Sequence, residues 1–200
     1  MARATFGQVT GDPGLELLNT VSWRLRGPGR EELLGDSARV LDWALQTGFL
    51  DETEHARLAA TLAGDAAAAE ALVADARGLR EDAYAMLVEG DAAAAERVAS
   101  RYRVALGRAR LEEGGPEQGG RWRWVDSAVA ATTPVDRAVR AVLDLAGSDR
   151  LRLLHQCEDD ECGWVYLDTS PRHNRRWCSA SDCGDRNRAR AYYRRHRVAE

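Results

Sequence analysis

Four cysteines lie in one 27-residue window of this 200-residue chain, as two C-x4-C pairs separated by fifteen residues. The pairs are Cys157 with Cys162 and Cys178 with Cys183. Each short loop can bring two thiolates to one metal ion, and two such loops complete the tetrahedral shell that zinc prefers. Because four thiolates leave no coordination position for water, we expect one structural Zn2+ ion. His155 and His173 lie nearby and are alternative ligands.

An arginine-rich segment surrounds and follows the second cysteine pair. Residues 163–199 hold nine arginines against three aspartates, whereas the whole chain has a net charge of −4. A basic end on an acidic remainder indicates binding to a polyanion, and we expect contacts with duplex DNA. The arginines expected at that contact are Arg172, Arg175, Arg176, Arg186, Arg188, Arg190, Arg194, Arg195 and Arg197. A solvated basic helix is the alternative interpretation.

The acidic run at 158–161 lies between the first two cysteines and would repel phosphate. We therefore expect this loop to face away from DNA. The alternative function for such a segment is a zinc-dependent RNA-binding or protein-interaction module, because small zinc fingers serve both purposes.

Two kinds of local structure must position the cysteines. LRLLHQ and WVYLD flank the first pair and predict a β-hairpin with that pair at its turn, and the second pair lies at a helix start. This is the layout of a treble-clef-like finger. Along the final helix, Ala189, Tyr192, Tyr193 and His196 follow i, i+3, i+4, i+7 spacing, which predicts a face packed against the hairpin.

The preceding 148 residues read as helices with one hairpin. Helices are expected over 14–25, from Asp36 or Ser37 to Gly48 and from Asp51 onward. Each copy of the repeated heptapeptide GDAAAAE, at 64–70 and 90–96, also predicts a helix, with Asp65 or Asp91 as its N-cap. A last helix is expected from Thr133 to Gly147, with Val135, Ala138, Val139, Val142 and Leu143 on one apolar stripe. GRARLEE and RWRWVD flank a turn-forming stretch and predict the hairpin. The fold class is thus mainly α with small β elements (α+β). We place a helical domain at 1–148 and the finger at 149–200.

The helical domain shows no Ser-His-Asp signature, phosphate-cradling glycine loop or His-Glu metal motif, so we expect no enzyme activity. Asn19, Trp23 and Trp43 are candidates for binding a small-molecule ligand, since aromatic rings and one amide can orient such a molecule; they would serve equally as core residues. A single finger contacts little DNA, so we expect a homodimer.

No apolar run approaches the roughly 18 residues of a membrane span. We expect no membrane contact and a cytoplasmic protein, nucleoid-associated when bound to DNA.

The run C-x4-C-G-W-V-Y-L-D-T-S followed by R-R-W-C-x4-C-G-D-R resembles the CGNR zinc finger family. LELLNTV at 15–21, DSARVLDWALQTGFL at 36–50 and LREDAY at 79–84 resemble the companion ABATE domain. The resemblance implies a bacterial stress-induced transcription regulator with a DNA-binding finger, zinc on the four cysteines, and Arg175, Arg176 and Arg186 among the motif's basic residues.

Two departures from the family pattern stand out. Asp185 occupies the position of the family's Asn, and Pro171 with His173 alters the basic loop that follows the first cysteine pair.

Overall fold

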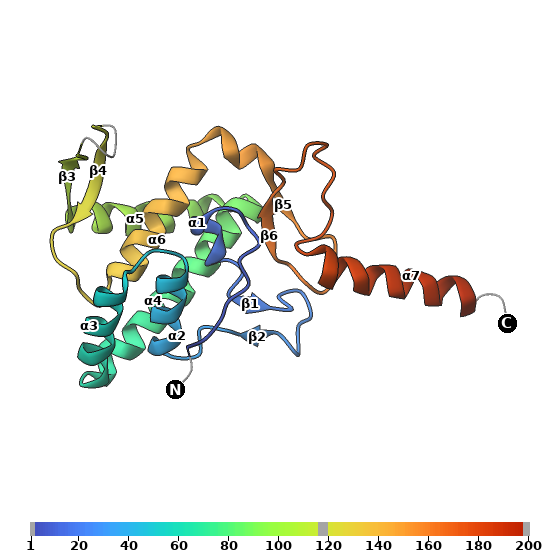
Figure 1. The fold of residues 1–200 in the computed structure, drawn as a ribbon, viewed down its shortest axis with the longest axis horizontal. Coiled ribbons are helices and arrows are strands. Elements are labelled where there is room, and N and C mark those ends of the chain that lie inside the picture. The colour runs from blue at the N-terminus through green and yellow to red at the C-terminus, as the bar shows by residue number, and fades with distance from the viewer. Residues whose placement is uncertain (1–2, 116–119, 198–200) are drawn as a thin grey trace.

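The computed structural model describes residues 3–115 and 120–197 of the chain. A layered group of helices forms the body of the molecule, and the finger lies at one end with its last helix extending outward (Figure 1). Three two-stranded antiparallel sheets accompany the helices in the described residues. The predicted fold class, mainly α with small β elements, is confirmed.

Four helices of the body start at an aspartate, as their sequences predicted. The side-chain oxygen of each aspartate accepts hydrogen bonds from backbone N–H groups of the first turn, which have no partner within the helix. At Asp51 the Glu54 carboxylate also bonds the Asp51 backbone, completing a capping box. The helices are α2 (Ser37–Gln46), α3 (Glu52–Ala63), α4 (Ala66–Tyr84, continued by a π-turn, Ala85–Glu89) and α5 (Ala92–Gly107), begun by Asp36, Asp51, Asp65 and Asp91.

Helix α6 (Thr133–Ala146) lies at the centre of the body, packed on α1 (Pro13–Glu16) and α5. Of its predicted stripe, Val135, Ala138, Val139 and Val142 are buried and Leu143 is partly buried. A Cβ atom at Gly14 of α1 would lie 2.8 Å from the α6 backbone, so only glycine permits this approach.

The prediction of a helix over 14–25 was wrong. Helix α1 covers only Pro13–Glu16, and the chain then turns into strand β1 (Val21–Ser22), which pairs with β2 (Glu31–Glu32). Backbone groups after α1 form bonds with the finger: the Val21 carbonyl accepts from the Trp164 indole at 2.7 Å, and the Arg24 N–H donates to the Cys162 carbonyl at 3.0 Å. Groups engaged in these long-range bonds cannot join a helical ladder.

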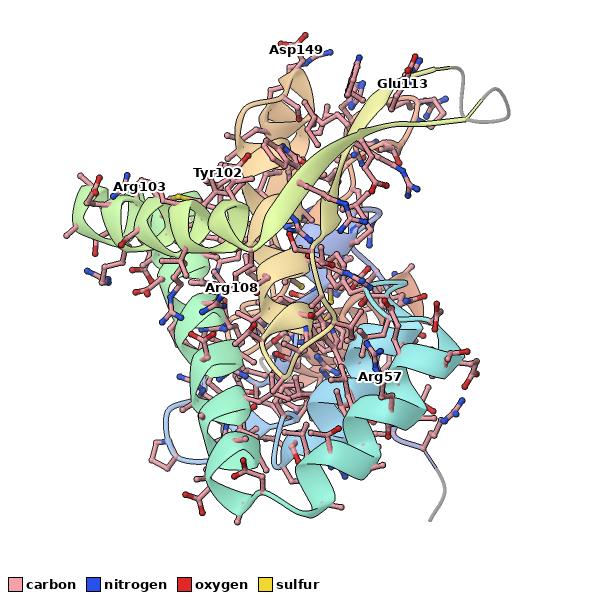
Figure 2. The ribbon with its side chains drawn as sticks, turned by 90° about the vertical axis from the view of Figure 1, so that its left-hand side faces the viewer. Arg57, Tyr102, Arg103, Arg108, Glu113 and Asp149 are labelled. Atoms are coloured by element: carbon pink, nitrogen blue, oxygen red, sulfur yellow. The ribbon has the colours of Figure 1, made fainter. Side chains whose placement is uncertain are left out.

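The hairpin predicted from GRARLEE and RWRWVD is present as β3 (Ala109–Glu113) and β4 (Trp122–Asp126). Figure 2 shows it rising beyond the helices, with Glu113 near its end. The Asp126 carboxylate ties its base to α6 by accepting from Arg137 and Arg140, each at 2.6 Å. Part of the predicted turn stretch, 116–119, lies outside the described residues.

The finger follows a short 3-10 turn, Asp149–Leu153. Strands β5 (Leu154–Gln156) and β6 (Val165–Leu167) form its hairpin, and a π-turn (Ala180–Gly184) leads into α7 (Asp185–Arg197). Val165 and Leu167 are buried in the same apolar core as the body helices. The division into domains at 148–149 stays a prediction. Strand β6 lies in the predicted finger by sequence, but it packs into the apolar core of the helical body.

The predicted packing face of α7 is not packed. Tyr192 is 51% and Tyr193 66% exposed, and Ala189 and His196 are exposed as well. The prediction of a buried face was wrong because α7 extends away from the body after its first turns, and no other described helix or strand lies along the rest of it (Figure 1). In the part of the chain that the structure describes, no helix has both the length and the apolar character of a membrane span.

Candidate metal centre and its basic helix

The four cysteines meet in one buried cluster. All four sulfur atoms lie within 4.8 Å of one another, and among the described residues no other group of His, Cys, Asp or Glu gathers in this way. The Cys162 and Cys178 Sγ atoms are 3.7 Å apart, and those of Cys178 and Cys183 are 3.5 Å apart. A tetrahedron with Zn–S bonds of about 2.3 Å has edges of about 3.8 Å, so the cluster fits one zinc ion.

Local backbone structure holds the sulfurs in place. In the β5–β6 loop the Cys157 N–H donates to the Trp164 carbonyl at 2.7 Å, and the Cys162 N–H donates to the Asp159 carbonyl at 3.0 Å. The second pair is joined to the first by the Cys178 N–H, which donates to Cys157 Sγ at 3.4 Å. Loop and π-turn thus present their thiols to the same point.

The electrostatics of the cluster favour a bound cation. Hydrogen bonds with its sulfur neighbours and then burial raise the pKa of Cys178, and a hydrogen bond with Cys157 raises that of Cys162. Four thiolates therefore require a compensating positive charge, and soft thiolate donors select zinc over oxygen-preferring ions. His155 is exposed and stacks on Tyr166, and His173 Nδ1 lies 3.0 Å from the Asp168 carbonyl oxygen, so neither belongs to the cluster.

The finger is fastened to the body through Asn19. Its side-chain amide donates to the Val165 carbonyl and accepts from the Val165 N–H, both at 2.9 Å, and Asn19 itself is 3% exposed. The amide thus replaces a backbone partner at the open edge of β6.

The LREDAY segment of α4 supplies a second attachment. The Tyr84 hydroxyl donates to the Gly163 carbonyl at 3.1 Å, and Arg24 stacks on the Tyr84 ring while pairing with Glu81 at 2.6 Å. Gly163 has φ +70, and a Cβ there would lie 2.9 Å from Arg24 Cβ. Glycine is therefore required immediately after the first cysteine pair.

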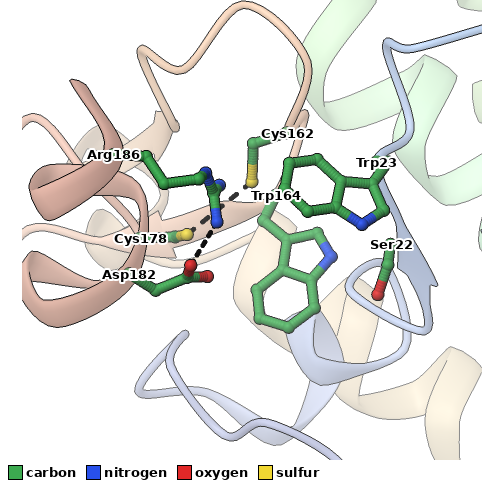
Figure 3. A pocket seen from close by; sticks show the side chains of 7 residues that line it. All are labelled: Ser22, Trp23, Cys162, Trp164, Cys178, Asp182 and Arg186. Atoms are coloured by element: carbon green, nitrogen blue, oxygen red, sulfur yellow. Dashed lines mark hydrogen bonds and ion pairs between the residues drawn. The ribbon is translucent and has the colours of Figure 1, made fainter. Parts of the chain in front are cut away.

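The structure does not bring the three predicted ligand-binding residues into one cavity. Asn19 is engaged by Val165, and Trp43 is buried in the body core beside Phe49. Trp23 lines a pocket of about 100 Å³ against the sulfur cluster (Figure 3).

Two of the predicted DNA-contacting arginines serve the finger itself. Arg175 donates to the Trp177 carbonyl at 3.0 Å and lies over the Tyr166 ring. Arg186 donates to Cys183 Sγ at 2.9 Å, pairs with Asp182 and stacks on Trp23. A guanidinium beside the thiolates offsets part of their negative charge.

The acidic loop contacts the basic segment, and its predicted orientation away from DNA stays a prediction. Asp159 is fully buried and accepts from Asn187 at 2.6 Å and from Arg190 at 3.3 Å. Glu161 also pairs with Arg190, at 2.9 Å, and Glu158 pairs with Arg176 at 2.6 Å. Asp159 and Glu161 thus hold the first turns of α7 on the β5–β6 loop that carries Cys157 and Cys162, called the metal loop below.

The remaining arginines lie on the exposed surface. Arg188 contacts Asp185, the residue that replaces the family's Asn, within the first turn of α7. Arg172, Arg194 and Arg195 have no carboxylate partner within the described residues. The Arg197 side chain lies outside the described part of the chain.

Three residues that matter here were missed in the sequence. Asp159 is one of four consecutive acids, and nothing in that run marks which carboxylate is buried. Asn187 follows Arg186 without a distinguishing pattern. Gly163 carried a signal, because a glycine directly after a cysteine pair indicates a left-handed turn.

A helical body fastened to a four-cysteine finger with a projecting arginine-rich helix defines a zinc-finger protein. Residues 153–196 match the CGNR zinc finger family. Residues 11–156 match the ABATE family, described as "Putative stress-induced transcription regulator". The protein therefore belongs to the ABATE family and carries a CGNR zinc finger, which confirms the resemblance noted in its sequence. The comparison with curated proteins finds no match.

Proposed function

We propose that this protein is a transcription regulator that binds duplex DNA through α7, with one structural zinc ion on Cys157, Cys162, Cys178 and Cys183. The observation that carries the proposal is the set of exposed arginines on a helix that extends clear of the body (Figure 1). Of these, Arg194 and Arg195 have no carboxylate partner within the described residues, and Arg188 pairs only with the exposed Asp185 of its own first turn. Its thirteen residues span about 20 Å, and the major groove of B-DNA admits an α-helix.

The arginines divide into two roles under this proposal. Arg175 and Arg176 are bonded within the finger, and Arg186 and Arg190 hold the first turns of α7. Arg188, Arg194 and Arg195 remain to contact phosphates, joined by Arg172 from the preceding loop and by Arg197. Each phosphate neutralised should contribute about −0.9 to the slope of log affinity against log salt.

When bound, zinc would have a structural role: through its four ligands it would join the β5–β6 loop to the π-turn that begins α7. Four thiolates leave no open coordination position, so the proposal assigns the protein no catalytic reaction. Binding of one short helix is weak, and we propose that two copies act together as a homodimer in the cytoplasm, associated with the nucleoid.

The test is fluorescence anisotropy of zinc-loaded protein with genomic duplex fragments across a salt series. We expect Arg188→Ala, Arg194→Ala and Arg195→Ala together to weaken binding and to reduce the slope by up to about 2.7. The matched control replaces Arg103, Arg121 and Arg123, three exposed arginines on α5 and the β3–β4 hairpin, and changes net charge equally.

Binding lost in the α7 variant and kept in the control would support the proposal. Equal losses in both variants would indicate only a net-charge effect and would contradict a role for α7. Structured RNA that displaces duplex DNA at moderate salt would favour the RNA-binding alternative.

A further inference from the structure

A small pocket gives access to two sulfurs of the metal cluster. The pocket, of about 100 Å³, is lined by Cys162 and Cys178, one from each C-x4-C pair, together with Trp23, Trp164 and Ser22. Figure 3 shows the indole rings on one side and the sulfurs with Arg186 on the other. A water molecule occupies about 30 Å³ of liquid, so the pocket suits molecules of a few heavy atoms.

The backbone at the pocket is strained. Trp23 has φ 55, a conformation that bulky residues rarely adopt. The bond from the Arg24 N–H to the Cys162 carbonyl, at 3.0 Å, holds it there, and its ring stacks on Arg186. Strain of this kind persists where surrounding contacts enforce it and gathers at functional sites.

The four sulfurs are not equivalent in their hydrogen bonds. Cys183 Sγ accepts from Arg186 at 2.9 Å, and Cys157 Sγ accepts from the Cys178 N–H at 3.4 Å. Such donors withdraw electron density from a thiolate and make it less nucleophilic. The two sulfurs at the pocket, Cys162 Sγ and Cys178 Sγ, have each other and Cys183 Sγ as hydrogen-bond partners. They are therefore better placed to attack an electrophile than Cys157 and Cys183, which do not line the pocket.

We infer that this pocket is an oxidation site for small peroxides, at which Cys178 and Cys162 form a disulfide, metal is released and α7 loses its anchor. The inference rests on the proposed zinc site. Hydrogen peroxide is the co-reactant, because a molecule of two oxygens fits the pocket, and the inference predicts slower reaction with bulky organic peroxides.

The chemistry balances in two steps. One of the two pocket thiolates attacks one oxygen of hydrogen peroxide, the O–O bond breaks, and a sulfenic acid and hydroxide form. The other thiolate, 3.7 Å away, then attacks the sulfenic sulfur and displaces a second hydroxide. Two thiolates have lost two electrons, and peroxide has gained them. Two ligands remain, too few for a closed zinc site.

Loss of the metal acts on α7 through contacts already described. Arg186 bonds Cys183 Sγ, and Asn187 and Arg190 bond Asp159 of the metal loop. Once the two cysteine loops are no longer joined by zinc, these bonds lose their common support. DNA binding should fall together with zinc content.

The experiment treats full-length, zinc-loaded protein with hydrogen peroxide and records zinc release with a chromogenic chelator. Tert-butyl hydroperoxide serves as the bulky oxidant. The rate of zinc release with each oxidant is divided by the rate at which the same oxidant reacts with free glutathione, which corrects for their different intrinsic reactivities. Non-reducing peptide mapping locates the disulfide. Ser22→Leu narrows the pocket, and Ser127→Leu, at an exposed position away from it, is the matched control.

We expect a Cys162–Cys178 disulfide, zinc release several-fold slower in Ser22→Leu than in Ser127→Leu, and a lower normalised rate with the bulky oxidant. Equal rates in the two variants would overturn the inference, as would a disulfide made mainly by Cys157 or Cys183, or zinc retained after treatment. Protein that holds no zinc before oxidation would instead refute the proposed metal site, so the two failures are distinguishable.

Discussion

Replacing Asn19 with alanine tests whether this residue fastens the finger to the body. The Asn19 amide satisfies both the N–H and the carbonyl of Val165, each at 2.9 Å, at a buried position. Alanine would leave two backbone groups without partners. Each buried group left unsatisfied costs about 1–3 kcal/mol, so we expect the free energy of unfolding to fall by about 2–6 kcal/mol.

The assay is urea unfolding of zinc-loaded protein, followed by tryptophan fluorescence and by far-UV circular dichroism. Asn174→Ala is the control, because Asn174 is exposed and its replacement should change the free energy of unfolding by no more than about 0.5 kcal/mol. A similarly small change for Asn19→Ala would refute the reasoning. It would mean that the Val165 groups find water or other partners, and it would return Asn19 to the list of candidate ligand contacts.

Two further predictions concern Gly163 of the finger and Glu16 of helix α1. Gly163→Ala should lower the free energy of unfolding by about 2–5 kcal/mol, from a left-handed backbone and a Cβ 2.9 Å from Arg24 Cβ. Gly48→Ala is the control, because Gly48 also has a left-handed backbone (φ +79) but open space where a Cβ would lie. In the same urea assay it should lose only the free energy due to the backbone conformation, about 1–2 kcal/mol. Equal losses in the two variants would contradict a steric contact between a Cβ at position 163 and Arg24. Burial raises the pKa of Glu16, whose Oε1 accepts from Thr10 and whose Oε2 has no hydrogen-bond partner among the described residues. Because the folded state disfavours the charged carboxylate, the stability of wild type relative to Glu16→Gln should decrease as pH rises from about 4.3 through that raised pKa, and a difference independent of pH would disprove it.

Much of the local structure could be read from short stretches of sequence. The aspartates before α2, α3, α4 and α5 were identified as helix starts because a cap needs only the side chain and the next three residues. The apolar stripe of α6 was legible for the same reason, since helical periodicity is a property of one segment.

The stretch after α1 could not be read in this way. Its apolar spacing is compatible with a helix, but its backbone bonds Trp164 and Cys162, about 140 residues further along the chain. Local spacing carries no information on such partners, and the tertiary bonds override helical propensity.

The sequence by itself determined the cysteine cluster, the family and the presence of a basic helix, because ligand type, spacing and charge are written in consecutive residues. Only the tertiary structure decided which charges remain available on that helix. Arg186 and Arg190 are engaged by the metal loop whereas Arg194 and Arg195 extend beyond it, and this division depends on where the acidic loop folds against α7. An arginine that already pairs with a nearby carboxylate is less available to an outside partner, and the fold sets the distance between the two charges.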